Sequence, residues 1–108
     1  MNRFVALLLV TLALTAADAR GDIFRWDNGE VIPGTEGIVP GPGVDLDLRA
    51  LEYAQLSGVD LTDASLRGAL LTNAKMVGAN LTNVYMSPAK LDQVDFTGAN
   101  LTSAYLLA

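Results

Sequence analysis

Residues 44–108 can be written as thirteen consecutive blocks of five: VDLDL RALEY AQLSG VDLTD ASLRG ALLTN AKMVG ANLTN VYMSP AKLDQ VDFTG ANLTS AYLLA. The third residue of every block is large and apolar: Leu46, Leu51, Leu56, Leu61, Leu66, Leu71, Met76, Leu81, Met86, Leu91, Phe96, Leu101 and Leu106. The first residue is small and apolar in every block except the second, where Arg49 stands. A fixed period over most of the chain is the signature of a repeat architecture, so this pattern decides the fold.

A period of five excludes the two simplest structures. Five helical residues turn the side chain by about 500°, which would scatter the leucines around the helix. In a straight strand an odd period would send successive leucines to opposite faces. A chain that turns a corner in every block satisfies the pattern, with the first and third residues pointing inward.

The last two residues of the blocks support such corners. The fifth position carries residues that accept turn geometry: Gly58, Asp63, Gly68, Asn73, Gly78, Asn83, Pro88 and Gly98. The fourth position is often threonine, which we expect in short extended segments: Thr62, Thr72, Thr82, Thr97 and Thr102.

These blocks resemble the pentapeptide-repeat family, whose pattern is A(D/N)LXX. Compare ANLTN at 79–83, ANLTS at 99–103 and VDLTD at 59–63. The resemblance covers residues 44–108 and implies an all-β fold, a right-handed quadrilateral β-helix with four blocks per coil and about three coils. Arg49 and Pro88 depart from the pattern, and Arg49 leaves the start of the first coil open.

The N-terminus has the pattern of a secretory signal. One arginine, Arg3, precedes an apolar run over 4–14, and Ala17-Asp18-Ala19 forms an A-x-A cleavage site. A membrane span needs about 20 apolar residues, more than this run offers. We therefore predict a helical signal peptide over residues 1–19, a mature chain without a stable membrane span, and a secreted, periplasmic or cell-envelope location.

Residues 20–43 form a separate segment rich in glycine and proline. Within it, residues 23–26 and 30–32 flank Asp27-Asn28-Gly29, and the Asn-Gly pair predicts positive φ angles in a tight hairpin turn. We expect Phe24 and Trp26 to cover the open end of the following domain. Residues 34–43 are expected to form an irregular connector. The signal segment followed by residues 22–43 also resembles the opening of secreted bacterial pentapeptide-repeat proteins.

Composition limits the chemistry available to the chain. It contains no histidine and no cysteine, which excludes disulfides, Cys/His zinc sites and histidine-based triads. A net charge of −5 and a pI near 4.3 argue against nucleic acid as a partner. Carboxylate pairs remain as catalytic or calcium candidates: Asp45 with Asp47, Asp60 with Asp63, and Asp92 with Asp95. Because a convex rod offers these pairs no evident cleft, we predict no enzyme activity, catalytic residue, cofactor or metal site.

Residues twenty apart should stack into surface columns. Asp60, Asn80 and Asn100 form one such column, which we expect to hydrogen-bond locally. Lys75 and Asp95 are expected to form an exposed ion pair. Tyr85 and Tyr105 could stack on each other or contact a sugar or partner. The predicted surface contacts are Tyr85, Tyr105, Thr62, Thr82 and Thr102, of which the threonine column is also compatible with an ice-binding surface.

The functional prediction is an exported, non-enzymatic solenoid that acts as a structural or protein-binding module, with an unknown protein or envelope component as partner. One alternative is a DNA-mimicking topoisomerase inhibitor, which the family resemblance suggests, although a rod about 15 Å tall at ~4.8 Å per coil covers few base pairs. Another is an extracellular carbohydrate- or calcium-binding module. The sequence stops at Leu106-Leu107-Ala108, which leaves open a longer protein, end-to-end self-association at an exposed strand edge, or a frayed end.

Overall fold

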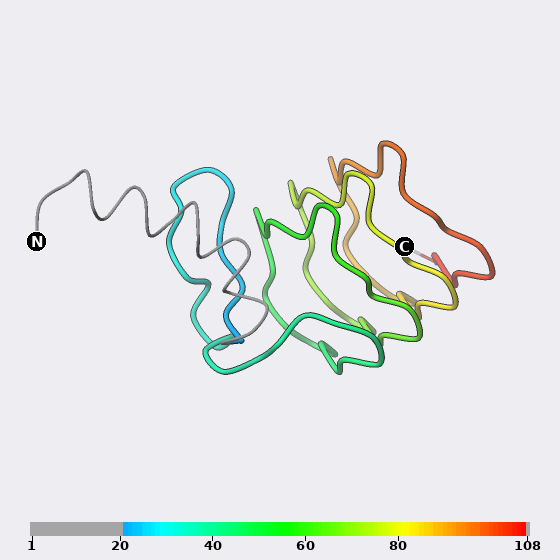
Figure 1. Ribbon diagram of the computed structural model, residues 1–108, viewed down its shortest axis with the longest axis horizontal. Helices are drawn as coiled ribbons and strands as arrows, with labels where there is room; N and C mark the ends of the chain where they lie inside the picture. Colours follow the sequence, from blue (N-terminus) through cyan, green and yellow to red (C-terminus); the bar gives the residue numbers. More distant parts are fainter. Residues whose placement is uncertain (1–20, 108) are drawn as a thin grey trace, which may run out of the picture.

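The computed structural model describes residues 21–107, so the predicted signal peptide over 1–19 lies outside the described residues. Figure 1 shows the chain winding through stacked coils from residue 44 onward, with residues 21–43 at one end of the stack. Within residues 21–107 there is no continuous helix or strand, and the backbone pairs through single-residue bridges. No helix that could cross a membrane lies in this part of the chain.

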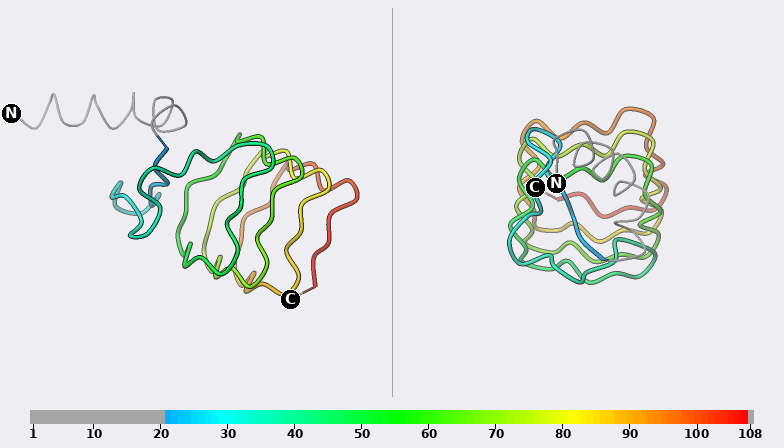
Figure 2. Two further views of the ribbon diagram at one scale, coloured as in Figure 1. Left: turned by 90° about the horizontal axis from the view of Figure 1, so that it is seen from below. Right: turned by 60° about the vertical axis from the view of Figure 1, so that its left-hand side comes forward.

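Parallel bridges connect residues that are twenty positions apart. The second residue of each block carries the bridge, which gives four columns, 45/65/85/105, 50/70/90, 55/75/95 and 60/80/100. Backbone hydrogen bonds run alongside: Ser65 N–H donates to Val44 O at 2.9 Å, and Leu46 N–H donates to Ser65 O at 2.7 Å. Four columns of parallel bridges define a β-solenoid, and its coils overlie one another in a four-sided outline in Figure 2. We number the coils by residue range: first 44–63, second 64–83 and third 84–103.

A corner separates each side of the solenoid from the next. The N–H of a block's first residue donates to the carbonyl of the preceding block's third residue, as Ala54 does to Leu51 at 3.1 Å, in the corners of the solenoid other than the one before Ala89. The fifth residue has a positive φ in these corners, whether it is Gly58 (φ 74°), Asn73 (φ 63°) or Leu48 (φ 61°). Pro88 is an exception, since it follows a cis peptide bond.

The threonines in the fourth position lie inside these corners, so the prediction of extended segments for them is wrong. Residues 62, 72, 82, 97 and 102 are all turn residues. The reason is geometric: with a corner in every block, extended backbone is confined to the residues around the bridge. The fourth residue is therefore already part of the bend.

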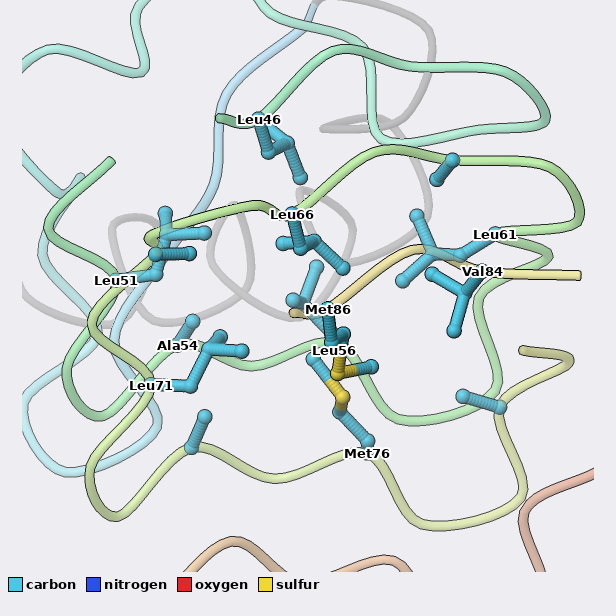
Figure 3. Packing of buried hydrophobic residues seen from close by; sticks show 14 of the residues in the cluster. Leu46, Leu51, Ala54, Leu56, Leu61, Leu66, Leu71, Met76, Val84 and Met86 are labelled. Carbon is cyan, nitrogen blue, oxygen red and sulfur yellow. The ribbon is translucent and has the colours of Figure 1, made fainter. Parts of the chain in front are cut away.

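The third residues of the blocks fill one shared interior, as the period of five predicts. All nine from Leu46 to Met86 are fully buried, and the alanines of the first positions pack beside them. Figure 3 shows Leu46, Leu66 and Met86 following one another in one row of this interior. Leu91, Phe96 and Leu101 are half-buried, because only one described coil packs against them.

Residues 23–32 form a hairpin, with an antiparallel bridge between Phe24 and Val31. Its turn differs from the expected Asn-Gly turn, since Gly29 (φ 75°) takes a positive φ and Asn28 does not. The Gly29 N–H donates to Arg25 O at 3.0 Å, so the turn is wider than a two-residue loop.

The hairpin pairs with one side of the first coil. Arg25 forms an antiparallel bridge with Ala54, and Gln55 N–H donates to Phe24 O at 2.7 Å. The side chains that join the core from the hairpin are Ile23 and Ile32, not the predicted Phe24 and Trp26. Alternation along the paired strand turns Ile23 inward and its neighbour Phe24 outward.

Candidate functional site

The predicted threonine column consists of side chains already engaged in hydrogen bonds. Thr62 Oγ1 donates to Asp60 Oδ1 at 2.6 Å, and the Thr62 N–H donates to the same oxygen at 3.1 Å. The same pair of bonds connects Thr82 with Asn80 and Thr102 with Asn100. Each hydroxyl proton is thus used within its own corner, and the column serves the backbone bend.

Aspartate in this role has a lowered pKa, because the hydrogen bonds that it accepts favour its ionised form. The Thr62 hydroxyl, followed by the Thr62 backbone N–H, lowers the pKa of Asp60 below its ordinary value. Thr97 lowers the pKa of Asp95 in the same way. A general acid needs a raised pKa, so these two carboxyl groups are suited to accepting hydrogen bonds and not to donating protons.

The two predicted tyrosines are stacked. The ring centroids of Tyr85 and Tyr105 lie 4.9 Å apart with an interplanar angle of 25°. The guanidinium carbon of Arg67 lies 4.8 Å from the Tyr85 ring centroid. Arg67 and Tyr105 therefore both contact the Tyr85 ring, which is 39% exposed, whereas Tyr105 is 58% exposed. Of the two rings, Tyr105 is the more accessible to a sugar that stacks on an aromatic face.

Asp47 ties the first coil to the second, a role that its sequence pairing with Asp45 did not reveal. Its carboxylate accepts hydrogen bonds from the Ser65 hydroxyl and from the Arg67 N–H at 2.8 Å, and it lies 3.7 Å from Arg67 Nε. The Ser65 hydroxyl makes the largest contribution to the lowered pKa of Asp47. The sequence signal for this contact was the separation of Asp47 and Arg67 along the chain, which equals the length of one coil.

The predicted ion pair between Lys75 and Asp95 does not form. Lys75 Nζ instead lies 4.2 Å from the ring centroid of Trp26 in the hairpin. The Trp26 indole N–H donates to Asn73 O at 2.6 Å, and the ring lies 5.8 Å from that of Tyr53. This cluster, which we call the tryptophan latch, fastens the hairpin across the first two coils.

Arg49, the residue that breaks the pattern of small first positions, also holds the N-terminal segment. Its side chain is exposed, and Nη1 donates to Gly34 O at 3.1 Å. The carboxylate pairs do not gather into a site: among residues 21–107 no three acidic side chains are placed to hold a metal ion.

Several exposed apolar side chains lie on two adjacent sides of the solenoid and at the corner between them. Leu48 is 82% exposed and Leu70 is 38% exposed, and with Tyr85 and Tyr105 they belong to two adjacent columns and the corner between them. We call this the apolar side. The sequence signal was present but unused: Leu48 and Leu70 occupy block positions that are polar or glycine in most other blocks.

A depression of about 410 Å³ opens at the same corner. It is lined by Gly68, Pro88, Ala89, Lys90, Leu91 and Asp92. The two remaining columns carry polar bridge residues: Gln55, Lys75, Asp95, Asp60, Asn80 and Asn100.

The architecture defines the class as a β-solenoid with one corner in every five residues. The family model described as Pentapeptide repeats matches residues 51–87 in eight copies. Residues 51–87 therefore match pentapeptide repeats, and the resemblance of the five-residue blocks to that family is confirmed over this part of the chain.

Among solved structures, the chain is similar to a pentapeptide repeat protein from the thylakoid lumen of Arabidopsis thaliana. The two share 28% sequence identity over 58% of this chain, with a TM-score of 0.46. The match spans 47% of the Arabidopsis chain, about half its length. No curated protein matches the chain.

Proposed function

We propose that the chain is an exported, non-enzymatic solenoid that acts as a structural or protein-binding module outside the cytoplasm. The observation that carries the proposal is the division of the surface. Polar side chains such as Thr62 and Asp60 are used in hydrogen bonds within the solenoid, whereas Leu48 and Leu70 are left exposed on the apolar side. Exposed apolar patches are characteristic of interaction sites, and Leu48 and Leu70 contribute exposed apolar surface to two adjacent coils.

Export is supported by the first nineteen residues of the sequence. A basic residue, an apolar run and the A-x-A site have the pattern of a secretory signal, which supports the proposal. A secreted, periplasmic or envelope location would bring the apolar side into contact with an extracellular protein or an envelope component.

Mass spectrometry of the chain expressed in a secreting bacterial host tests export. We expect cleavage between Ala19 and Arg20 and recovery outside the cytoplasm. An Ala19→Leu variant is the matched control and should keep its N-terminal segment, because the cleavage site needs a small residue. Wild-type protein recovered uncleaved in the cytoplasm would refute export.

Two assays separate the proposal from its alternatives. A gyrase supercoiling assay should show no inhibition by micromolar protein, since strong inhibition would point to duplex mimicry. Calorimetry with calcium and with polysaccharides should show no heat of binding. A saturable heat that is lost in Tyr105→Ala would replace the proposal with a carbohydrate-binding function.

A further inference from the structure

The turn of the hairpin contains a chemically reactive pair of residues. Asn28 is exposed in this turn, and it is the only asparagine of the chain that is followed by glycine. In such a pair the backbone nitrogen of the glycine can attack the asparagine carboxamide, because no Cβ shields that nitrogen. The other asparagines of the sequence precede arginine, alanine, leucine or valine, whose side chains hinder the same attack.

Two hydrogen bonds at this turn have opposite effects on the attack. The Glu30 N–H donates to Asn28 Oδ1 at 2.9 Å, which polarises the carboxamide and places a donor where negative charge would develop. The Gly29 N–H donates to Arg25 O at 3.0 Å, which holds the proton that the attacking nitrogen must lose. The first bond activates the electrophile, and the second restrains the nucleophile.

The two bonds depend on different parts of the structure. The bond from Glu30 to Asn28 spans two residues within the turn, so it can persist when the hairpin opens. The bond from Gly29 to Arg25 crosses the turn, beside a second crossing bond from Arg25 N–H to Glu30 O at 2.8 Å. The tryptophan latch fastens the hairpin that carries both crossing bonds. Release of the latch would therefore free the nucleophile and leave the activating bond in place.

We propose that Asn28 is a deamidation site whose rate is set by the tryptophan latch. The Gly29 nitrogen forms a bond to Asn28 Cγ and loses its proton to solvent. The Cγ–Nδ2 bond breaks, and Nδ2 takes up a proton from solvent and leaves as ammonia. Water then opens the resulting succinimide at either carbonyl, which gives aspartate or isoaspartate. Water is the only co-reactant, and the proposal does not depend on export.

The product would weaken the hairpin that restrained the reaction. Either product adds a negative charge at residue 28, in a turn that already contains Asp27. Isoaspartate also adds a methylene to the backbone before Gly29, which would displace the Gly29 N–H from Arg25 O. The deamidated fraction should therefore show red-shifted emission from Trp26, the only tryptophan of the chain, and unchanged emission would refute this step.

Peptide mass spectrometry of the purified chain, aged at mildly alkaline pH, tests the proposal. Cleavage after Arg25 and Arg49 releases a peptide over 26–49 in which Asn28 is the only asparagine, so a gain in its mass reports this site alone. The gain is that of replacing NH₂ by OH, and a zero-time sample corrects for reaction during digestion. We expect slow deamidation in the folded wild-type chain, with isoaspartate among the products.

Variants separate the effect of the latch from that of the turn. Trp26→Ala should accelerate deamidation at least about fivefold, because the open hairpin becomes more populated. The matched control is Tyr105→Ala, which removes an exposed aromatic ring outside the latch and should leave the rate unchanged. Asn28→Gln should abolish the mass gain, since the longer side chain closes a ring far less readily. Urea below the unfolding transition should accelerate the wild-type reaction, a test that requires no variant to fold.

Three results would overturn the proposal. The first is the absence of a mass gain at Asn28 in both the folded chain and the chain unfolded in urea. The second is a folded wild-type chain that deamidates as fast as the unfolded one, because the hairpin would then impose no restraint. The third is a rate that neither Trp26→Ala nor urea below the transition increases.

Discussion

Replacing Leu66 with alanine tests the shared interior directly. Leu66 is fully buried in the second coil, in one row with Leu46 and Met86 (Figure 3). Buried Leu→Ala substitutions cost about 2–5 kcal/mol, and the cost rises with the cavity that remains. Here the cavity cannot readily collapse, because the Leu66 N–H donates to Tyr85 O at 2.6 Å and the coil is held on both sides. We therefore expect about 3–5 kcal/mol of lost stability.

Urea denaturation followed by circular dichroism measures this loss. For a domain of this size, about 3 kcal/mol corresponds to a fall of roughly 12 °C or more in Tm. Leu101→Ala is the matched control, since Leu101 occupies the same block position but is half-buried in the third coil. It should cost about 1–2 kcal/mol. Equal losses for the two variants, or a loss below about 1 kcal/mol for Leu66→Ala, would refute the closed interior.

Three further substitutions test the corners and the latch. Leu48→Asn should raise the free energy of unfolding by up to about 1 kcal/mol, because asparagine accepts a positive φ, and a lower Tm would contradict the strain argument. The lowered pKa of Asp60 stabilises the fold above its ordinary pKa of 3.8, and this contribution is lost as pH falls through the lowered value. In Asp60→Asn, the free energy of unfolding should therefore fall less steeply as the pH is lowered from about 5 to 2, as measured by denaturant titration. An unchanged pH dependence would show that ionised Asp60 does not stabilise the fold. Trp26→Ala should cost about 2 kcal/mol, less than a fully buried tryptophan, because Trp26 is 39% exposed. Loss of hairpin protection in hydrogen exchange should accompany it, whereas unchanged exchange would show that the latch does not hold the hairpin.

The interior could be predicted from the sequence because a period of five constrains every block in the same way. No single residue carries this signal, so the departure at Arg49 did not obscure it. The corner glycines and asparagines follow from the same constraint, since a left-handed φ restricts the residue types that fit.

The contacts of long side chains could not be predicted in this way. Lys75 was expected to meet Asp95, its neighbour one coil away, but its flexible chain reaches the face of Trp26. That contact depends on where the hairpin docks, which the repeat does not encode. The prediction of extended segments at the threonines was wrong for a different reason. The β propensity of threonine favours strands, but the local hydrogen bond of Thr62 to Asp60 favours the bend.

Single-residue bridges at a spacing of twenty give the interior and the surface different tolerances to insertion. Adding five residues would keep every apolar residue pointing inward, but it would move all later side chains round to the next side. Tyr105 would then leave Tyr85, and the hollow at Pro88 would no longer share an edge with Leu48. Only a change of twenty residues preserves both. Insertions of five residues can thus lengthen the solenoid without disturbing its interior. Only insertions of a whole coil keep the stacked surface side chains next to each other.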